Sequence, residues 1–256
     1  MKIATWNVNN VRKRADQVLD WAKAAAPDVI CLQELKTADA DLPRAAFEAA
    51  GWHGVWVGQK TWNGVAILSR SAPVTVRTAL PGDDADRQAR YVEAAVAGVL
   101  IACLYAPNGN PCPGPKFDTK LAWLDRLTRH AAGLIAAGVP AVLAGDFNVV
   151  PEPRDIYDTT SYDGDALVSD EARMRFAALL AQGWTDALRQ AIPDGPAYTF
   201  WDYRRRRWAR DAGLRIDHLL LSPAAALRFR DAGVDRIPRG WDAPSDHAPV
   251  WALIAD

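Results

Sequence analysis

Several short apolar segments of this chain lead directly to a carboxylate or an amide. The apolar run at 29–32 precedes Glu34, and the run at 141–144 precedes Asp146 and Asn148. Runs of this length, rich in Val, Ile, Leu and Ala and bounded by Gly or Pro, are typical of buried β-strands. A chain with many such strands and helices between them must bury the strands in layered sheets, so the pattern restricts the fold to an α/β type.

Between the predicted strands, apolar residues recur at helical spacing. Residues 12–26, 117–137 and 170–182 are predicted helices, and Ser169 and Gly183 are suitable start and stop residues for the last of them. Strands are predicted over residues 2–7, 28–33, 52–58, 65–69, 91–97, 99–105, 141–144, 216–221 and 250–254. Hairpins mixed with helices favour two sheets packed face to face with helices outside. No linker-like segment divides residues 1–256, so we expect a single domain.

Charge and cysteine content exclude some classes of protein. With 30 basic and 31 acidic residues, composition alone indicates neither nucleic acid nor membrane as a partner. The local exception is a run of four arginines at 204–207. Three cysteines without paired spacing argue against a disulfide framework and favour a reducing compartment. No secretory or membrane-spanning apolar run is present, so we expect a cytoplasmic protein without a membrane partner.

Asp146 and Asn148 are two residues apart, so their side chains share one face of an extended chain. A carboxylate there can orient or deprotonate water, and an amide can donate to a phosphate oxygen. The alternative is a plain turn after a strand. Glu34 alone would be a solvated strand end, but beside Asp146 it becomes a candidate ligand for a hard cation, which prefers carboxylate oxygens.

Asp217 interrupts the apolar run at 214–221. A buried charge is costly unless it is paired, and an imidazole is a suitable partner. Of four histidines, His247 lies in a proline-flanked acidic loop, so we pair it with Asp217. A salt bridge from Asp217 to Arg215 is the alternative, and His218 is expected to be structural on the opposite face.

Three further polar residues lie at or near strand ends. Asn7 ends the first strand, Tyr105 ends another, and Asp246 stands beside His247. An amide or a carboxylate can join a metal site, and a phenol can reach a phosphate. A turn signal is the alternative for Asn7 and Asn9, and a core aromatic is an equal alternative for Tyr105.

Seven motifs occur in order between residues 2 and 254. They are Trp-Asn-Val-Asn-Asn at 6–10, Leu-Gln-Glu-Leu-Lys at 32–36, Asn-Gly-Val-Ala-Ile-Leu-Ser at 63–69, Leu-Tyr-Ala-Pro-Asn-Gly at 104–109, Gly-Asp-Phe-Asn-Val at 145–149, Leu-Arg-Ile-Asp-His-Leu-Leu at 214–220 and Ser-Asp-His-Ala-Pro-Val at 245–250. Together they resemble exonuclease III, the bacterial abasic-site endonuclease family within the endonuclease/exonuclease/phosphatase superfamily. Trp-Asp-Tyr at 201–203 is more specific to the DNA-repair branch.

The resemblance implies a four-layer α/β sandwich of the DNase I-like kind. It implies a phosphodiesterase that uses Mg²⁺ or Mn²⁺ and cuts duplex DNA 5′ of abasic sites. It also implies 3′→5′ exonuclease activity and removal of groups that block 3′ ends. We expect a monomer, because binding DNA needs no symmetry partner.

The resemblance also implies three groups of site residues. The metal group is Asn7, Glu34 and Asp246. The catalytic group is Tyr105, Asp146, Asn148, Asp217 and His247. The DNA-binding group is Phe200, Trp201, Arg204, Leu214 and Ile216. Weaker candidates for the DNA face are Lys36, Trp62, Lys116 and Lys120.

Within the catalytic group, Asp146 matches the residue that orients or activates water, and Asn148 and Tyr105 match phosphate contacts. Asp217 and His247 match a pair that stabilises charge on the phosphate. The sequence leaves open whether Asp146 or His247 is the general base.

Within the DNA-binding group, Phe200, Leu214 and Ile216 match the walls of a pocket for a base-free sugar, which selects its substrate by shape. Arg204 matches a residue that inserts beside the flipped sugar, and residues 205–207 would contact phosphates. A solvated arginine run is the plain alternative.

Two departures from the family are Leu35 and the proline-rich loop at 108–115. They leave open the balance among endonuclease, exonuclease and 3′-phosphatase activities. Two rival functions are a phosphatase for a lipid head group or small molecule, and a nucleic-acid-binding module without catalysis.

Overall fold

The computed structural model describes residues 1–255 and contains two six-stranded mixed sheets. Sheet A has the order β11-β12-β1-β2-β4-β3, formed by β1 (Lys2–Asn7), β2 (Val29–Gln33), β3 (His53–Val57), β4 (Val65–Ser69), β11 (Phe229–Val234) and β12 (Val250–Ile254). Sheet B has the order β5-β6-β7-β8-β10-β9, formed by β5 (Val74–Arg77), β6 (Tyr91–Val96), β7 (Val99–Tyr105), β8 (Ala141–Asp146), β9 (Thr185–Asp186) and β10 (Asp217–Leu221).

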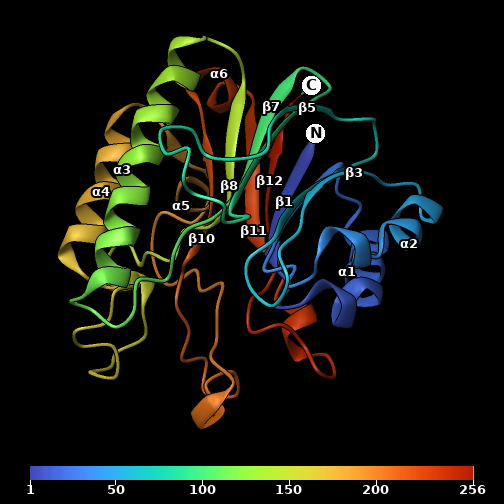
Figure 1. Ribbon diagram of the computed structural model, residues 1–256. Helices are drawn as coiled ribbons and strands as arrows, with labels where there is room; N and C mark the ends of the chain where they lie inside the picture. The colour runs from blue at the N-terminus through green and yellow to red at the C-terminus, as the bar shows by residue number, and fades with distance from the viewer. Residues whose placement is uncertain (256) are drawn as a thin grey trace.

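The longer helices lie outside the two sheets (Figure 1), whereas the short helix at 187–191 packs against strands of both. The α-helices are α1 (Val11–Ala25), α2 (Arg44–Ala49), α3 (Pro115–Ala136), α4 (Asp170–Ala181), α5 (Ala187–Ala191) and α6 (Pro223–Ala226). Short 3₁₀ turns are η1 (Asp39–Asp41), η2 (Pro153–Asp155), η3 (Arg204–Arg206) and η4 (Ile237–Gly240). Figure 1 shows α3 and α4 against the outer face of sheet B, and α1 and α2 on the side of sheet A.

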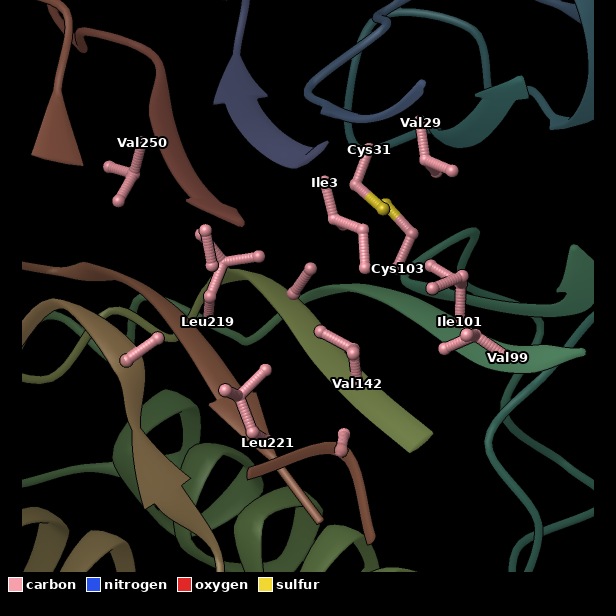
Figure 2. Close-up of a cluster of buried hydrophobic side chains, with 14 of the residues drawn as sticks. Ile3, Val29, Cys31, Val99, Ile101, Cys103, Val142, Leu219, Leu221 and Val250 are labelled. Carbon is pink, nitrogen blue, oxygen red and sulfur yellow. The ribbon is translucent and has the colours of Figure 1, made fainter. Parts of the chain in front are cut away.

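Three hydrophobic layers hold these elements together. The central layer lies between the sheets and combines Ile3 and Val29 of sheet A with Ile101, Val142 and Leu219 of sheet B (Figure 2). A second layer joins sheet B to α3 and α4, and a third joins sheet A to α1 and α2. The predicted four-layer α/β sandwich is therefore confirmed.

Most predicted elements are present, with small shifts at their ends. Ser169 caps α4 through its side chain, as expected, and both predicted hairpins pair antiparallel. The helix predicted from 117 begins at Pro115, with Gly114 as its N-cap, because proline suits the first helical position. The edge strand β5 was not predicted, since all four of its residues are exposed and it has no buried face to give a pattern.

The strand register brings the polar strand ends together. Parallel pairing of β7 with β8 sets Tyr105 beside Asp146, and antiparallel pairing of β10 with β8 sets Asp217 opposite the same residue. In sheet A, the parallel pair β1 and β2 sets Asn7 beside Gln33, directly before Glu34. The ends of both sheets therefore meet along one edge of the sandwich.

The cysteines Cys31, Cys103 and Cys112 are free. Figure 2 shows the Cys31 and Cys103 side chains pointing toward one another between the sheets. Within residues 1–255, no helix has both the length and the apolar character needed to span a bilayer.

Candidate active site

Asp217 and His247 form the pair predicted from the sequence. His247 Nδ1 lies 2.8 Å from Asp217 Oδ2, and Thr199 Oγ1 donates to the same oxygen at 2.6 Å. The alternative partner, Arg215, binds elsewhere, on the buried carboxylates of Asp155 and Asp186. Because Asp217 is fully buried at the start of β10, it fixes the imidazole in one orientation.

His218 lies on the opposite face of the sheet from His247, as expected. Its ring packs against Phe147 and Phe176 on the other face of sheet B, and its Nδ1 lies 3.0 Å from Arg215 Nη1. It takes no part in the site.

Asp146 faces the other nitrogen of the His247 imidazole. Its Oδ2 lies 3.9 Å from His247 Nε2, too far for a hydrogen bond but suited to a bridging oxygen of water or phosphate. Asn7 Nδ2 donates to Asp146 Oδ2 at 3.0 Å, and the Asn148 backbone N–H donates to Asp146 Oδ1 at 2.9 Å. The Asp146 carboxylate is therefore held in place on both oxygens.

The pKa values of Asp146 and His247 both rise. Burial, followed by the negative charge of Asp217, raises the pKa of Asp146 to about 7. Burial opposes a charged His247, but the carboxylates of Asp217 and Asp146 outweigh it and raise the pKa of His247 to about 10. The carboxylates therefore favour a positively charged imidazole, and burial favours a protonated Asp146.

The Glu34 carboxylate, which follows β2, lies within hydrogen-bond distance of three donors. Its Oε1 accepts from Asn7 Nδ2 at 2.9 Å and from the Tyr105 hydroxyl at 2.8 Å, while Lys36 Nζ lies 2.6 Å from Oε2. Burial opposes ionisation, but Lys36 and Asn7 outweigh it and hold the pKa of Glu34 below its usual value. Burial and the charges of Glu34 and Asp146 raise the pKa of Tyr105, which keeps its phenol protonated.

Asp246 joins this group through Asn9 rather than directly. Asn9 Nδ2 donates to Asp246 Oδ1 at 3.1 Å, and its own Oδ1 accepts from Lys36 Nζ at 2.6 Å. The backbone N–H of Asn9 donates to Asn7 Oδ1 at 3.0 Å. Asn9, for which a turn was an equal reading, therefore connects the three residues of the predicted metal group.

Asn148 adopts a left-handed backbone conformation, with φ at 50°. Its Nδ2 donates to the Ala106 carbonyl at 2.9 Å, and its Oδ1 accepts from Asn108 Nδ2 at 3.2 Å. An amide has two N–H hydrogens, and within residues 1–255 the second has no protein acceptor. Glu34 also has a positive φ, at 53°, so two of the candidate residues have the backbone strain that is concentrated at functional sites.

Two groups of side chains could hold a cation. Asp146, Asp217 and His247 place ligand atoms within 4.8 Å of one another, and Asp217 Oδ1 is buried without a hydrogen-bond partner. However, one of these three ligands is an imidazole nitrogen, whereas a hard divalent cation prefers oxygen ligands. The carboxylates of Glu34 and Asp246 with the amide oxygen of Asn7 form the better donor set for a hard divalent cation.

The predicted pocket walls are covered rather than open. Leu214 is 0% exposed and Ile216 is 2% exposed, and both pack in a cluster with Tyr162 and Leu167. Phe200 is partly exposed, and its ring centroid lies 4.8 Å from that of His247. Tyr162 and Leu167 of the segment at 156–168 therefore pack against two of the three residues predicted to line a pocket for a base-free sugar.

Two residues expected to contact DNA are buried in the structure. Trp201 is 0% exposed, with its Nε1 bonded to Asp211 and its ring packed edge-on against Trp208, so it supports the loop from inside. Arg207 is also buried, where it bonds the Tyr162 hydroxyl and stacks over the Tyr157 and Tyr162 rings. Arg207 can be buried, unlike the other arginines of the run, because the faces of aromatic rings stabilise its guanidinium group.

The remaining arginines of the run face solvent. Arg204, with residues 205 and 206 of η3, is exposed at the tip of a segment that projects from the end of the sandwich, drawn in orange in Figure 1. Of the weaker DNA-face candidates, Trp62 is exposed, whereas Lys120 is fully buried and cannot lie on that face.

Sequence reasoning missed Thr199 and Asn108. Thr199 Oγ1 bonds the Asp217 carboxylate, and Asn108 bonds the Asn148 side chain. Neither carries a local signal, because a lone threonine or loop asparagine is common and only the tertiary contact gives it a role.

Known proteins resemble this chain along its whole length. The pattern of the endonuclease/exonuclease/phosphatase family matches residues 4–247. The chain is 32% identical over 264 residues to exodeoxyribonuclease III of Haemophilus influenzae, a match that covers 98% of this chain and 99% of that protein.

Two solved structures share both fold and sequence with it. NExo of Neisseria meningitidis, described as a 3′-5′ exonuclease and as a 3′ phosphatase bound to a product DNA hairpin, has a TM-score of 0.97 and 43% identity over 100% of both chains. An AP endonuclease from Archaeoglobus fulgidus has a TM-score of 0.96 and 35% identity, again over 100% of both chains. The chain therefore belongs to the endonuclease/exonuclease/phosphatase family.

Proposed function

We propose that this protein is a metal-dependent DNA phosphodiesterase of the exodeoxyribonuclease III type, which cuts 5′ of abasic sites and trims blocked 3′ ends. The observation that carries the proposal is the 3.9 Å gap between Asp146 Oδ2 and His247 Nε2, which lies beside the Asn7–Glu34–Tyr105 cluster. A carboxylate near its pKa faces an imidazolium there, so one group can take a proton while the other donates to a phosphate oxygen.

In this proposal Asp146 orients the attacking water and takes its proton, because its pKa of about 7 suits a base at neutral pH. His247, held as a cation by Asp217, donates through Nε2 to the phosphate. Asn148 donates its second side-chain N–H, and the Tyr105 phenol, protonated at neutral pH, is a further donor.

The predicted metal group would hold a divalent cation, Mg²⁺ or Mn²⁺, through Glu34 and Asp246 with the oxygen of Asn7. A bound cation supplies Lewis-acid stabilisation of charge on the phosphate and on the departing 3′ oxygen. Asn9 and Lys36 hold these ligands in place beside the phosphate position.

Double-stranded DNA is the proposed partner. Three exposed arginines at 204–206 project from the same end of the molecule as the catalytic centre, and basic side chains there can neutralise backbone phosphates. The relatives named above act on DNA by their descriptions, including one bound to a DNA hairpin. This supports DNA over a lipid head group or a small phosphoester.

A second candidate is an enzyme specialised for 3′ ends. Tyr162 and Leu167 of the segment at 156–168 pack against Leu214 and Ile216, so both predicted pocket walls are buried. A terminal 3′ phosphate reaches the centre without base extrusion, so the covered pocket would spare this activity.

Two substrates separate these candidates. We would compare a duplex with one tetrahydrofuran abasic analogue and a nicked duplex with a 3′ phosphate, each with Mg²⁺ and with EDTA. A metal-dependent nick 5′ of the analogue supports the first candidate, and removal of the phosphate without that nick supports the second. Activity on neither substrate at any metal concentration would contradict both.

A further inference from the structure

Lys120 is a fully buried lysine on α3, with 0% of its surface exposed. Its Nζ donates to three backbone carbonyls, those of Asn148 at 2.6 Å, Ala166 at 2.8 Å and Asn108 at 3.1 Å. An ammonium group has three hydrogens, so all of them are committed to the main chain. Burying a cation without a bonded carboxylate is costly, which makes a purely space-filling role a poor explanation for it.

The three carbonyls belong to three separate segments around the catalytic centre. Asn108 follows β7, Asn148 follows β8, and Ala166 lies in the segment that covers Leu214. The side chains of Asn108 and Asn148 bond one another at 3.2 Å, so Lys120 holds the backbones of both members of an amide pair. The strained residue Asn148 is thereby fixed at both backbone groups, since its N–H bonds Asp146 and its carbonyl bonds Lys120.

The fit around the lysine is close. Gly109, directly after Asn108, has φ at +92°, and a Cβ there would lie 2.6 Å from Lys120 Cδ. The chain must therefore have glycine beside Asn108 for the lysine stem to pass, which couples the loop sequence to the lysine.

We propose that Lys120 is a positioning residue, which fixes the Asn108–Asn148 pair so that the free N–H of the Asn148 amide faces the phosphate. This inference rests on the phosphodiesterase function proposed above. Lys120 does not touch the substrate itself; it acts through Asn148.

The test compares Lys120→Met with a matched control, Arg126→Met. Arg126 is also a buried cation of α3, 8% exposed, and it also donates to a backbone carbonyl, that of Leu80, but it touches no site residue. At a temperature where both variants are folded by circular dichroism, we expect Lys120→Met to lower kcat about 10- to 100-fold with KM within about threefold, because a misplaced donor costs mostly transition-state stabilisation. We expect Arg126→Met to change neither by more than about twofold.

A double-mutant cycle with Asn148→Ala shows whether Lys120 acts through that amide. In the Asn148→Ala background, Lys120→Met should lower kcat by less than about threefold, because the group that it positions is gone. A full further loss, or a wild-type kcat for folded Lys120→Met, would overturn the inference. If Lys120→Met does not fold, the same measurements on Lys120→Gln decide the question.

An NMR measurement that does not depend on turnover tests the positioning by Lys120 separately from the proposed function. The side-chain amide resonance of Asn148, assigned by its loss in Asn148→Ala, should shift in Lys120→Met and stay in place in Arg126→Met. If wild-type protein cuts neither DNA substrate, the proposed function fails. The resonance then tests the positioning alone, and an unshifted signal would contradict it.

Discussion

The candidate active site and the arginine segment that projects from the same end of the molecule are stabilised in different ways. Asp146 and Asp217 lie at strand ends and His247 in the loop before β12; all three are buried, and each takes part in at least one hydrogen bond through its side chain. The arginines at 204–206 are exposed, and the only regular structure around them is a single 3₁₀ turn. We therefore expect changes at the sheet ends to affect the chemical step and changes in the loops to affect the choice of substrate.

The base of the projecting segment is nevertheless firmly held. Arg236 stacks over Trp201 and Trp208, and it pairs with Asp211 at 2.6 Å. Arg239 donates to the Trp201 carbonyl at 2.8 Å. The base of the segment is therefore held rigidly, while the guanidinium groups at 204–206 face solvent. Changes at its tip should alter DNA binding without disturbing the candidate active site.

The largest effect is expected at the centre, from Asp146→Asn. It removes the proposed base and should lower kcat by about 10³-fold or more, measured on the 3′-phosphate duplex under single turnover. A variant that keeps more than about a tenth of wild-type kcat would rule out Asp146 as the base.

The same substitution, Asp146→Asn, should lower kcat but leave the stability of the folded protein unchanged or higher. The pKa of Asp146 is raised in the folded protein to about 7, above its unfolded value, so the folded state binds the proton more tightly. This group therefore lowers stability as pH rises toward 7, and the uncharged amide removes that cost. Thermal unfolding in EDTA at pH 8 should give a Tm equal to or above that of wild type, and a clear fall would contradict this account.

Asp217→Asn should have the next largest effect. It removes the carboxylate that orients His247 and stabilises its charge, so kcat should fall about 10²-fold or more. Thr199→Val is the milder companion, because it removes one hydrogen bond to the same oxygen and should cost about tenfold or less. Equal losses in the two variants would show that the hydroxyl matters as much as the charge.

The pH dependence of kcat/KM tests the proposed roles of Asp146 and His247. Activity should rise as Asp146 loses its proton near pH 7 and fall as His247 loses its proton near pH 10. Because the Asp217 carboxylate raises the pKa of His247, the alkaline limb should move to lower pH in Asp217→Asn. An unmoved limb would assign that limb to another group.

This centre was also the part of the molecule that sequence reasoning placed best. Glu34, Asp146 and Asp217 each adjoin an apolar run, and strand periodicity carries such residues to a sheet edge without knowledge of the rest. The same logic gave the layered fold, since periodicity and hairpin signals are local. The Asp217–His247 pair followed from the cost of an unpaired buried charge.

The loops were harder to predict because their side chains are placed by contacts distant in the sequence. Nothing around Trp201 shows that Asp211 and Trp208 would bury it, and nothing in the arginine run marks Arg207 as the member that turns inward. Lys120 was a weaker candidate for the DNA face, yet its ammonium group donates to three loop carbonyls. Polar groups buried by tertiary contacts give no periodic signal.

A loop change should shift substrate preference without touching the centre. Leu167→Ala removes a side chain packed against the Leu214 cluster, so it should open space there at a cost of about 2–4 kcal/mol in unfolding free energy. We expect the ratio of abasic-site cleavage to 3′-phosphate removal to rise about tenfold. Leu179→Ala, buried in the layer beneath α4, is a control of similar stability cost and should leave that ratio unchanged.

The smallest effect is expected at the tip of the arginine segment. Arg205→Ala with Arg206→Ala removes two exposed charges and no buried side chain, so kcat should stay within about twofold while KM for duplex DNA rises several-fold. The slope of log KM against log salt should fall by about 1 for each phosphate that the variant no longer neutralises. Arg129→Ala, an exposed arginine on α3, is the matched control and should change neither. If the salt slope of the double variant equals that of wild type, the segment does not bind phosphates, and DNA must be held by another surface next to the same strand-end centre.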